Sequence, residues 1–366
     1  MSGKRVEALI SLENIAHNYK YLRSLVGDGC RVAAVVKADA YGHGAPEVCR
    51  LLSSLGADFF AVACTEEAAA LRKGGINGSI LVLGITPEEQ YADMALNDVI
   101  QTVASAGYAR SLAAHGKVRV HVKVDTGMSR LGIYCHSDGD ICAAADEIER
   151  IYTTENVSLE GIFTHFAESD EPGSDFTRRQ FEVFARLLGE LERRGVDCGI
   201  RHCCNSAGIL NFPEMHLDMV RAGIALYGYD PSPDTRDENL KPAMTLVSRV
   251  AFVSELRRGD TVSYGRTYTA DRSCCAAVIS IGYADGLMRA LSGRWSLMIN
   301  GKRAPLLGRI CMDLCIADVT DIPCAPGDEA VVFGPANTVD DMAARLGTIN
   351  YELLCSVKNR VPRRYI

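Results

Sequence analysis

Residues 32–44 read VAAVVKADAYGHG and combine a strand-like segment, a lysine and a turn. The first five are apolar without alternation, which is typical of a strand buried on both faces of a parallel sheet. Lys37 follows directly, then a turn rich in small residues, then Pro46, a residue suited to the first turn of a helix. An amine in an apolar setting loses its proton easily enough for Schiff-base chemistry. On this stretch alone, a lysine that extends from the strand end into solvent is the simpler interpretation.

Apolar runs and helix-like segments alternate from this stretch to about residue 240. The runs lie at 32–36, 59–63, 80–84, 99–103, 118–124, 159–164 and 217–220. Amphipathic segments between them include 14–25 and 175–194. Repeated strand–helix units predict a parallel sheet, and their number fits a closed (β/α)8 barrel as well as an open doubly wound sheet. No glycine-rich phosphate loop follows a run, so a dinucleotide or P-loop site is not expected.

A second, mostly β domain is predicted after the proline-rich acidic segment 230–234. Its expected strands lie at 245–256, 274–283, 295–299, 304–319 and 329–333, and one short helix is expected at 339–346. The predicted domains are therefore residues 1–240 and 241–366, with residues 1–12 a candidate to cross over and join the second.

Composition narrows the possible partners and compartments. The net charge of −7 comes without a dense basic run, so neither nucleic acid nor an anionic membrane is an expected partner. No apolar run approaches the roughly 20 residues that span a bilayer, and the run at 6–10 is too short for a signal peptide, which makes a cytoplasmic protein the expectation. The 14 cysteines include no C-x-x-C pair and are expected to be reduced, with no metal site.

Polar residues that could carry chemistry follow the predicted strands, where a parallel barrel places its reactive groups. Ser206 and Gly223 could form an anion cradle from a hydroxyl and closely approaching backbone, although Asn205-Ser206 taken alone is more simply a helix cap. Arg221 could equally make an ion pair, and His165 could be a satisfied core histidine. A Schiff-base lysine together with a phosphate cradle suggests pyridoxal 5′-phosphate (PLP).

The second domain contributes mainly tyrosines, in VSYGRTY (262–268), IGYADG (281–286) and INYE (349–352). A tyrosine is normally a poor base and a common core or interface residue. It becomes a candidate acid or base only beside a helper such as histidine or arginine.

With these pieces assembled, the chain resembles the bacterial PLP-dependent alanine racemases. The resemblance rests on motifs in family order from residue 35 to residue 352. Besides the three tyrosine motifs, they are VVKADAYGHG (35–44), HVKVDTGMSRLG (121–132), FTHFAESDE (163–171), NSA (205–207), VRAGIALYG (220–228) and GRICMD (308–313). The resemblance implies an eight-stranded α/β barrel, a β domain, and a head-to-tail homodimer in which each active site is completed by the partner's β domain.

The resemblance also implies two catalytic bases. Lys37 would hold PLP and act on one face of the substrate Cα, and Tyr264 of the partner subunit would act on the other. His165 would assist Tyr264 in a network with Arg221. An arginine that faces the pyridine nitrogen leaves it unprotonated, which disfavours a long-lived carbanion and argues for racemisation over decarboxylation.

The remaining implied roles concern binding. Further cofactor contacts would be Tyr41, Asn205, Ser206, Gly223, Ile224 and Tyr351. The substrate carboxylate would meet Arg130 and the backbone N–H of Met312, and Lys123 is a candidate for carbamylation. The substrate entrance would be lined by Tyr283, Asp170, Arg289, Arg309 and Ile349.

Two alternatives stay open. A serine or broad-specificity racemase of the same family is one, although Tyr351 crowds the β-carbon and favours alanine as the substrate, with D-alanine for peptidoglycan as the expected product. The other is a non-catalytic PLP-binding protein; proteins of that kind lack the second domain, which this chain has.

Overall fold

The computed structural model describes residues 4–232 and 236–366. Met1–Gly3 and residues 233–235, which include part of the predicted linker, lie outside the described residues. The chain forms two compact units. The barrel unit comprises Ile15–Ala40 and Ala45–Lys241, and the β unit comprises the segment up to Asn14, Tyr41–Gly44 and Pro242–Ile366.

The barrel unit is built on a closed parallel sheet, which confirms the (β/α)8 prediction. Within the described residues, eight strands are neighbours in the order β6-β5-β4-β3-β2-β10-β9-β8, and β8 pairs with β6 to close the ring. A short ninth strand, β7, pairs in parallel with the end of β6. The strands are β2 (Arg31–Val35), β3 (Phe59–Val62), β4 (Ser79–Val82), β5 (Ile100–Val103), β6 (Val118–Asp125), β7 (Ile133–Tyr134), β8 (Val157–Phe163), β9 (Ile200–His202) and β10 (Met219–Ala222).

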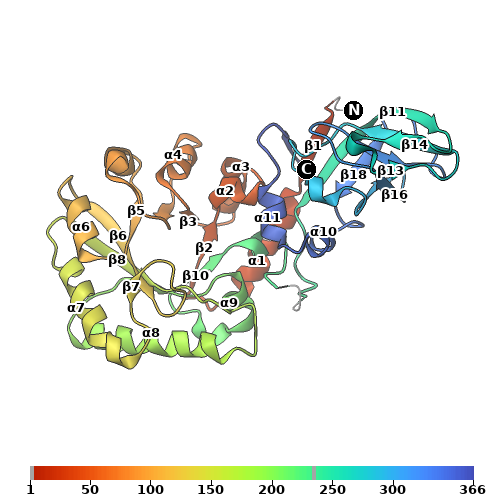
Figure 1. Ribbon diagram of the computed structural model, residues 1–366. Coiled ribbons are helices and arrows are strands. Elements are labelled where there is room, and N and C mark those ends of the chain that lie inside the picture. The colour runs from red at the N-terminus through yellow and green to blue at the C-terminus, as the bar shows by residue number, and fades with distance from the viewer. Residues whose placement is uncertain (1–3, 233–235) are drawn as a thin grey trace. The chain divides into compact units, whose positions relative to one another are not determined.

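Helices follow most strands, and α6, α7 and α8 lie outside the strands of this unit in Figure 1. The longest, α8, begins after Ser174, whose hydroxyl accepts a hydrogen bond from the Phe176 N–H, and buries Phe184, Leu187 and Leu191 on one face. The helices are α1 (Leu12–Ser24), α2 (Lys37–Tyr41), α3 (Ala45–Ser54), α4 (Thr65–Lys73), α5 (Tyr91–Leu96), α6 (Ala106–Ala113), α7 (Ile141–Tyr152), α8 (Asp175–Arg193) and α9 (Ser206–Asn211).

The β unit is a mixed sheet in the order β14-β17-β16-β15-β18-β11-β1-β19, and an additional β14–β11 pairing joins strands from its two halves. β1 lies between β11, with which it is antiparallel, and β19, with which it is parallel. The strands of this sheet are β1 (Val6–Ile10), β11 (Met244–Leu256), β14 (Cys274–Ile279), β15 (Ser296–Ile299), β16 (Lys302–Leu307), β17 (Cys315–Asp318), β18 (Glu329–Phe333) and β19 (Arg363–Tyr365). Two further strands, β12 (Thr261–Val262) and β13 (Tyr268–Thr269), form a separate antiparallel pair.

Two expectations for this unit were wrong. The predicted strand 304–319 is two strands, β16 and β17, separated by a loop that begins at Gly308 in the left-handed region (φ +64°). The predicted helix α10 (Val339–Leu346) is present, but a second helix, α11 (Asn350–Cys355), follows it. Ile349 precedes α11 without a side-chain cap, so the usual start signal is missing from the sequence.

Among the described residues, every helix is too short or too polar to span a bilayer. No disulfide joins the fourteen cysteines, all of which lie in the described ranges.

Candidate active site

The backbone after β2 turns in the left-handed sense directly beyond Lys37. Ala38, Asp39, Ala40 and Tyr41 have φ between +52° and +55°. Left-handed backbone costs a non-glycine residue about 1–2 kcal/mol, and such strain is concentrated at functional sites. The sequence predicted a turn at this place but not its handedness.

Glu67 holds the start of this turn. Its Oε1 accepts a hydrogen bond from the Ala38 N–H at 2.7 Å, and its Oε2 accepts one from the Ala63 N–H, beyond β3, at 2.8 Å. Asp39 accepts a hydrogen bond from the Ala45 N–H at the start of α3. The half-buried Lys37 therefore extends from backbone that neighbouring elements fix.

Strand register brings Lys123, Phe163 and His202 side by side inside the barrel. Lys123 pairs with Phe163, and Phe163 pairs with His202. The Lys123 Nζ lies 4.7 Å from the centroid of the Phe163 ring, and the His202 ring stacks on that ring at 4.7 Å. Burial, with the nearby charges of Arg221 and Arg130, lowers the pKa of Lys123 to about 7.

Arg221 on β10 is a buried cation held without a carboxylate among the described residues. Its guanidinium donates to the Thr164 and Cys203 carbonyls, to His202 Nδ1 at 2.8 Å and to His165 Nδ1 at 3.1 Å. Burial lowers its pKa to about 10, which still leaves it charged at neutral pH. Among the described residues, none accepts a hydrogen bond from its Nε–H.

These contacts assign the histidine tautomers, because an arginine can only donate. His165 accepts at Nδ1 and therefore carries its proton on Nε2. His202 accepts at Nδ1, so its Nε2–H donates to His121 Nδ1 at 2.9 Å. Burial first, and Arg221 next, hold the pKa values of His165 and His202 well below the ordinary value, which keeps both rings neutral. A line of hydrogen bonds thus runs from His121 through His202 and Arg221 to His165.

His121 ends this line on β6, and burial lowers its pKa to about 3. Its Nε2 is buried without a hydrogen-bond partner in the part of the chain that the structure describes. The ring fits because Gly161 stands opposite it on β8. A Cβ at residue 161 would lie 2.4 Å from the imidazole Cε1.

Replacing Gly161 with alanine is therefore expected to lower the free energy of unfolding by about 2–3 kcal/mol, because the ring has no room to retreat in the core. Urea denaturation measures this change. Gly189→Ala is the matched control, since Gly189 lies in α8 with no atom within 4 Å of an added Cβ, and should stabilise by about 0.5–1 kcal/mol. Equal effects of the two substitutions would contradict the packing described for His121.

Asp125 organises the loop that carries the exposed Arg130. Its Oδ1 accepts hydrogen bonds from the Gly127 and Ser129 N–H groups, each at 3.0 Å, and lies 3.3 Å from His136 Nε2. Burial acts to raise the pKa of Asp125, but these partners outweigh it and the pKa is lowered. Arg130 thus projects from an ordered turn at the carboxyl end of β6.

Ser206 and Gly223 meet as the sequence suggested, on adjacent turns after β9 and β10. The buried Ser206 Oγ accepts hydrogen bonds from the Gly223 N–H at 2.9 Å and the Ala225 N–H at 3.2 Å. Asn205 is the N-cap of α9, where its Oδ1 accepts from the Gly208 N–H. Ile224 opens the short 3-10 helix that follows Gly223.

Tyr264 and Met312 line one hollow of about 400 Å³ on the β unit. Their exposed fractions are 70% and 53%, and the exposed Leu314 lines the same hollow. The turn that carries Tyr264 packs against Arg309 of the GRICMD motif (308–313). Ser263 Oγ donates to the Arg309 carbonyl at 2.6 Å, and a Cβ at Gly265 would lie 2.6 Å from the Arg309 guanidinium.

The other predicted residues are divided between the units. Tyr41 and Tyr351 lie together in the β unit, with ring centroids 6.0 Å apart. Of the predicted entrance residues, Tyr283, Arg289 and Ile349 are exposed and Arg309 is half-buried in the same unit. The half-buried Asp170 belongs to the barrel unit.

Three supporting residues were missed by the sequence reasoning: Glu67, His121 and Phe163. His121 and Phe163 lie inside quoted motifs, but a histidine in the middle of a strand is normally a core residue. The signal was the alternation that puts His121 on the same strand face as Lys123. The role of Glu67 could not be recognised from the sequence, because it depends on the three-dimensional proximity of the backbone at Ala38 and Ala63.

Comparisons with known proteins cover the whole chain. Residues 10–231 match the family described as "Alanine racemase, N-terminal domain", and residues 243–365 match "Alanine racemase, C-terminal domain". An alanine racemase of Desulfovibrio desulfuricans is 44% identical over 369 residues, covering 99% of this chain and 98% of the relative. One from Methanococcus maripaludis is 43% identical and covers 100% of both chains.

Solved structures agree with these sequence matches. An alanine racemase of Clostridium difficile has a TM-score of 0.94 at 37% identity and covers 100% of this chain and 97% of that chain. The alanine racemase of Bacillus anthracis, solved with bound L-Ala-P, has a TM-score of 0.91 at 32% identity, with 100% and 96% covered.

Proposed function

The chain belongs to the alanine racemase family, and we propose that it interconverts L-alanine and D-alanine with PLP as cofactor. The observation that carries the proposal is Arg221, a buried cation between two neutral histidines whose Nε–H is accepted by none of the described residues.

The residues present fit PLP. The carboxyl end of the barrel is strongly cationic. The pKa of His165 is lowered by burial and by the nearby charges of Lys37, Lys123, Arg130 and Arg221, and three of these groups also lower the pKa of Lys123. A phosphate and a substrate carboxylate would both be stabilised there. Lys37 would hold the cofactor covalently, and Arg221 Nε would face its ring nitrogen. The phosphate would be bound by Ser206, Gly223, Ile224, Asn205, Tyr41 and Tyr351.

PLP, when bound, withdraws electrons from the substrate so that the proton on Cα can leave. Arg221 limits this withdrawal, because a guanidinium keeps its own protons and leaves a facing nitrogen unprotonated. Reprotonation at Cα is then favoured over reactions that need a long-lived carbanion, and release of CO₂ from an amino acid is not expected.

Two bases on opposite faces of Cα are needed to invert its configuration. Lys37, once released from the cofactor and neutral, serves one face. Tyr264 of the partner subunit serves the other, and the Nε2–H of His165 would stabilise its phenolate form. Arg221 supports this role, since its hydrogen bond to Nδ1 keeps the His165 proton on Nε2.

A homodimer would complete the site. Tyr264 and Met312 are exposed around one hollow of the β unit, together with Leu314. Exposed apolar groups that gather in this way favour contact with another protein surface, and a second copy of this chain is the proposed partner. The Met312 N–H and Arg130 would then bind the substrate carboxylate, with Tyr283, Asp170, Arg289, Arg309 and Ile349 at the substrate entrance.

Carbamylation of Lys123 is the expected modification of the site. An ordinary lysine has a pKa near 10.4 and is almost entirely protonated at pH 7, whereas the pKa of Lys123, lowered to about 7, leaves a substantial fraction of its amine neutral. The neutral amine adds to CO₂ with loss of a proton, and the resulting anion would relieve the repulsion between Lys123 and the arginines.

A carbamate on Lys123 is expected to give a ¹³C resonance with labelled bicarbonate that strengthens from pH 6 to pH 8, because the neutral amine fraction rises through its pKa. NMR on the intact enzyme measures it, and Lys123→Gln should lack the signal. An identical signal in that variant would assign the resonance to another amine.

The direct test of the proposed function is formation of D-alanine from L-alanine by the purified protein with added PLP. Turnover of L-serine should be lower, since by the family resemblance Tyr351 would crowd the β-carbon, although the rejection of an added hydroxyl is rarely more than about 100-fold. Faster turnover of serine would establish the serine racemase alternative. Binding of PLP without turnover of either amino acid would establish a non-catalytic protein. D-alanine made in this way would supply peptidoglycan synthesis.

A further inference from the structure

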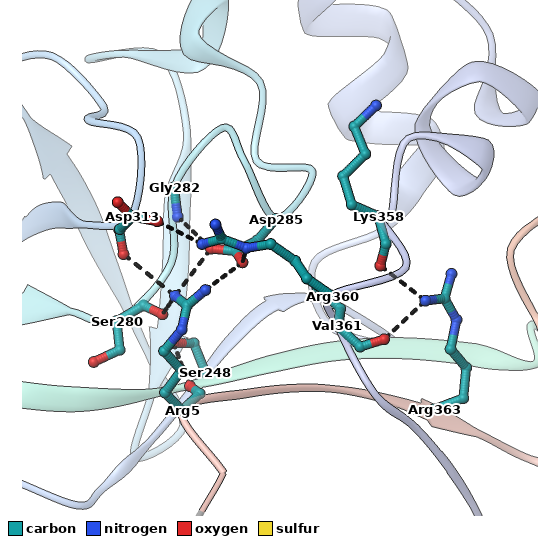
Figure 2. Close-up of polar contacts among 10 residues, drawn as sticks. All are labelled: Arg5, Ser248, Ser280, Gly282, Asp285, Asp313, Lys358, Arg360, Val361 and Arg363. Atoms are coloured by element: carbon teal, nitrogen blue, oxygen red, sulfur yellow. Dashed lines mark hydrogen bonds and ion pairs between the residues drawn. The ribbon is translucent and has the colours of Figure 1, made fainter.

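Asp285 in the β unit is a buried carboxylate that joins both ends of the chain. Its side chain is 1% exposed. Arg5, just before β1, contacts its Oδ1 at 2.6 Å, and Arg360, beyond α11, contacts the same oxygen at 2.7 Å. Figure 2 shows the two guanidinium groups converging on this one carboxylate.

The turn that contains Asp285 is clamped onto the backbone around Met312. The Tyr283 N–H donates to the Cys311 carbonyl at 3.1 Å, and the Ala284 N–H donates to the Met312 carbonyl at 3.0 Å. Gly282 is required at this approach, because a Cβ there would lie 2.3 Å from both of those carbonyl oxygens. A shift of the turn is therefore transmitted to Met312.

The arginines also hold the two flanks of this clamp. Arg360 reaches Asp313 at 2.5 Å, one residue beyond Met312, and Arg5 donates to the Ser280 carbonyl at 2.8 Å. Asp285 itself accepts the Gly282 N–H at 3.0 Å. Burial acts to raise the pKa of Asp285, but the hydrogen bonds from Arg5, Arg360 and Gly282 outweigh it and lower the pKa, so the carboxylate stays charged.

We propose that Asp285, Arg5 and Arg360 form a positioning cluster that fixes the backbone N–H of Met312 for the substrate carboxylate. The proposal rests on the proposed function, since the role of Met312 comes from it. None of the three residues is among those proposed to bind substrate or cofactor. The cluster acts through the turn at residues 281–286. Arg5 and Arg360 both restrain this turn, although they are far from it in sequence.

The test compares Arg360→Gln with Glu329→Gln, a control that breaks the Arg249–Glu329 ion pair of the same unit at 3.3 Å. Arg360→Gln should raise the KM for alanine about fivefold with kcat changed less than about twofold, because a hydrogen bond to the bound carboxylate is weakened in ground and transition state alike. Hydrogen–deuterium exchange in residues 311–314 should become faster in the same variant. Arg360→Lys should be intermediate, since an ammonium group lacks the fork that reaches both aspartates. Glu329→Gln should change none of these quantities.

Asp285→Asn tests the centre of the cluster, and Arg360→Gln keeps the proposal testable should that variant fail to fold. An unchanged KM and unchanged exchange in residues 311–314 would overturn the proposal, as would a fall in kcat and melting temperature without a change in KM. Failure of the proposed function is a separate result: the unsubstituted protein would then not racemise alanine, while the exchange measurement would still report on the cluster.

Discussion

Lys37→Ala is expected to lower kcat for alanine racemisation by about 10⁴-fold or more, because the substitution removes both the covalent attachment of the cofactor and one of the two bases. The fixed turn after β2 makes the loss difficult to recover, since Glu67 and Asp39 hold the backbone whether or not the amine is present. D-alanine formation measured with a D-amino-acid oxidase gives the rate, and the visible absorbance of the bound cofactor should shift in parallel.

The control for this loss is Lys117→Ala, which removes an exposed lysine of the barrel unit and should leave the rate unchanged. Activity of Lys37→Ala within tenfold of the unsubstituted enzyme would show that the attachment site and the base lie elsewhere.

Tyr264→Phe is expected to lower racemisation by about 10²–10⁴-fold, the usual contribution of one acid–base group. The equilibrium constant between enantiomers is one, so kcat/KM must fall equally in both directions. The rate at which the Cα proton exchanges with solvent need not fall equally for the two enantiomers. In ²H₂O, the enantiomer whose proton faces Lys37 should still exchange, and the other should exchange far more slowly.

A one-sided loss of exchange is thus the signature of two bases, and NMR of each enantiomer measures it. Tyr268→Phe is a suitable control, because Tyr268 lies on β13 just beyond the same turn and has no role in the mechanism. Exchange lost equally for both enantiomers would point to a general disruption of the site, and exchange kept for both would rule out Tyr264 as a base.

The alternation of strand-like and amphipathic segments was enough to predict a parallel sheet with helices, because long helices such as α8 and alternating strands such as 118–124 have clear periods. It did not distinguish a closed barrel from an open doubly wound sheet, and the family resemblance supplied that choice. Ile200–His202 was not among the predicted strands. A segment of three residues with the charged Arg201 at its centre is too short to show a hydrophobic period. It forms the strand β9 because it pairs with β8 on one side and β10 on the other. The strand predicted at 304–319 failed for the opposite reason, since apolar residues continue through a loop whose backbone geometry at Gly308 ends the pairing.

The site was predictable where chemistry is local and not where it depends on distant residues. Lys37 and Ser206 come after strands and Arg221 lies near the end of one, so their positions at one end of the barrel could be inferred. Asp285 reads as an ordinary turn residue, since its arginine partners are 280 and 75 positions away. The left-handed turn after Lys37 could not be predicted, because alanine and tyrosine rarely adopt that backbone.

The central claim is that one active site takes Lys37 from one subunit and Tyr264 from the other. A heterodimer of a Lys37→Ala chain and a Tyr264→Phe chain, purified through two different tags, tests it most directly. If the site is shared, one of its two sites has both bases and the other has neither, so the heterodimer should recover roughly half the activity of the unsubstituted dimer although each parent homodimer is nearly inactive. If Lys37 and Tyr264 of the same chain work together, every site in the heterodimer lacks one base, and activity no higher than that of the parents would contradict the account.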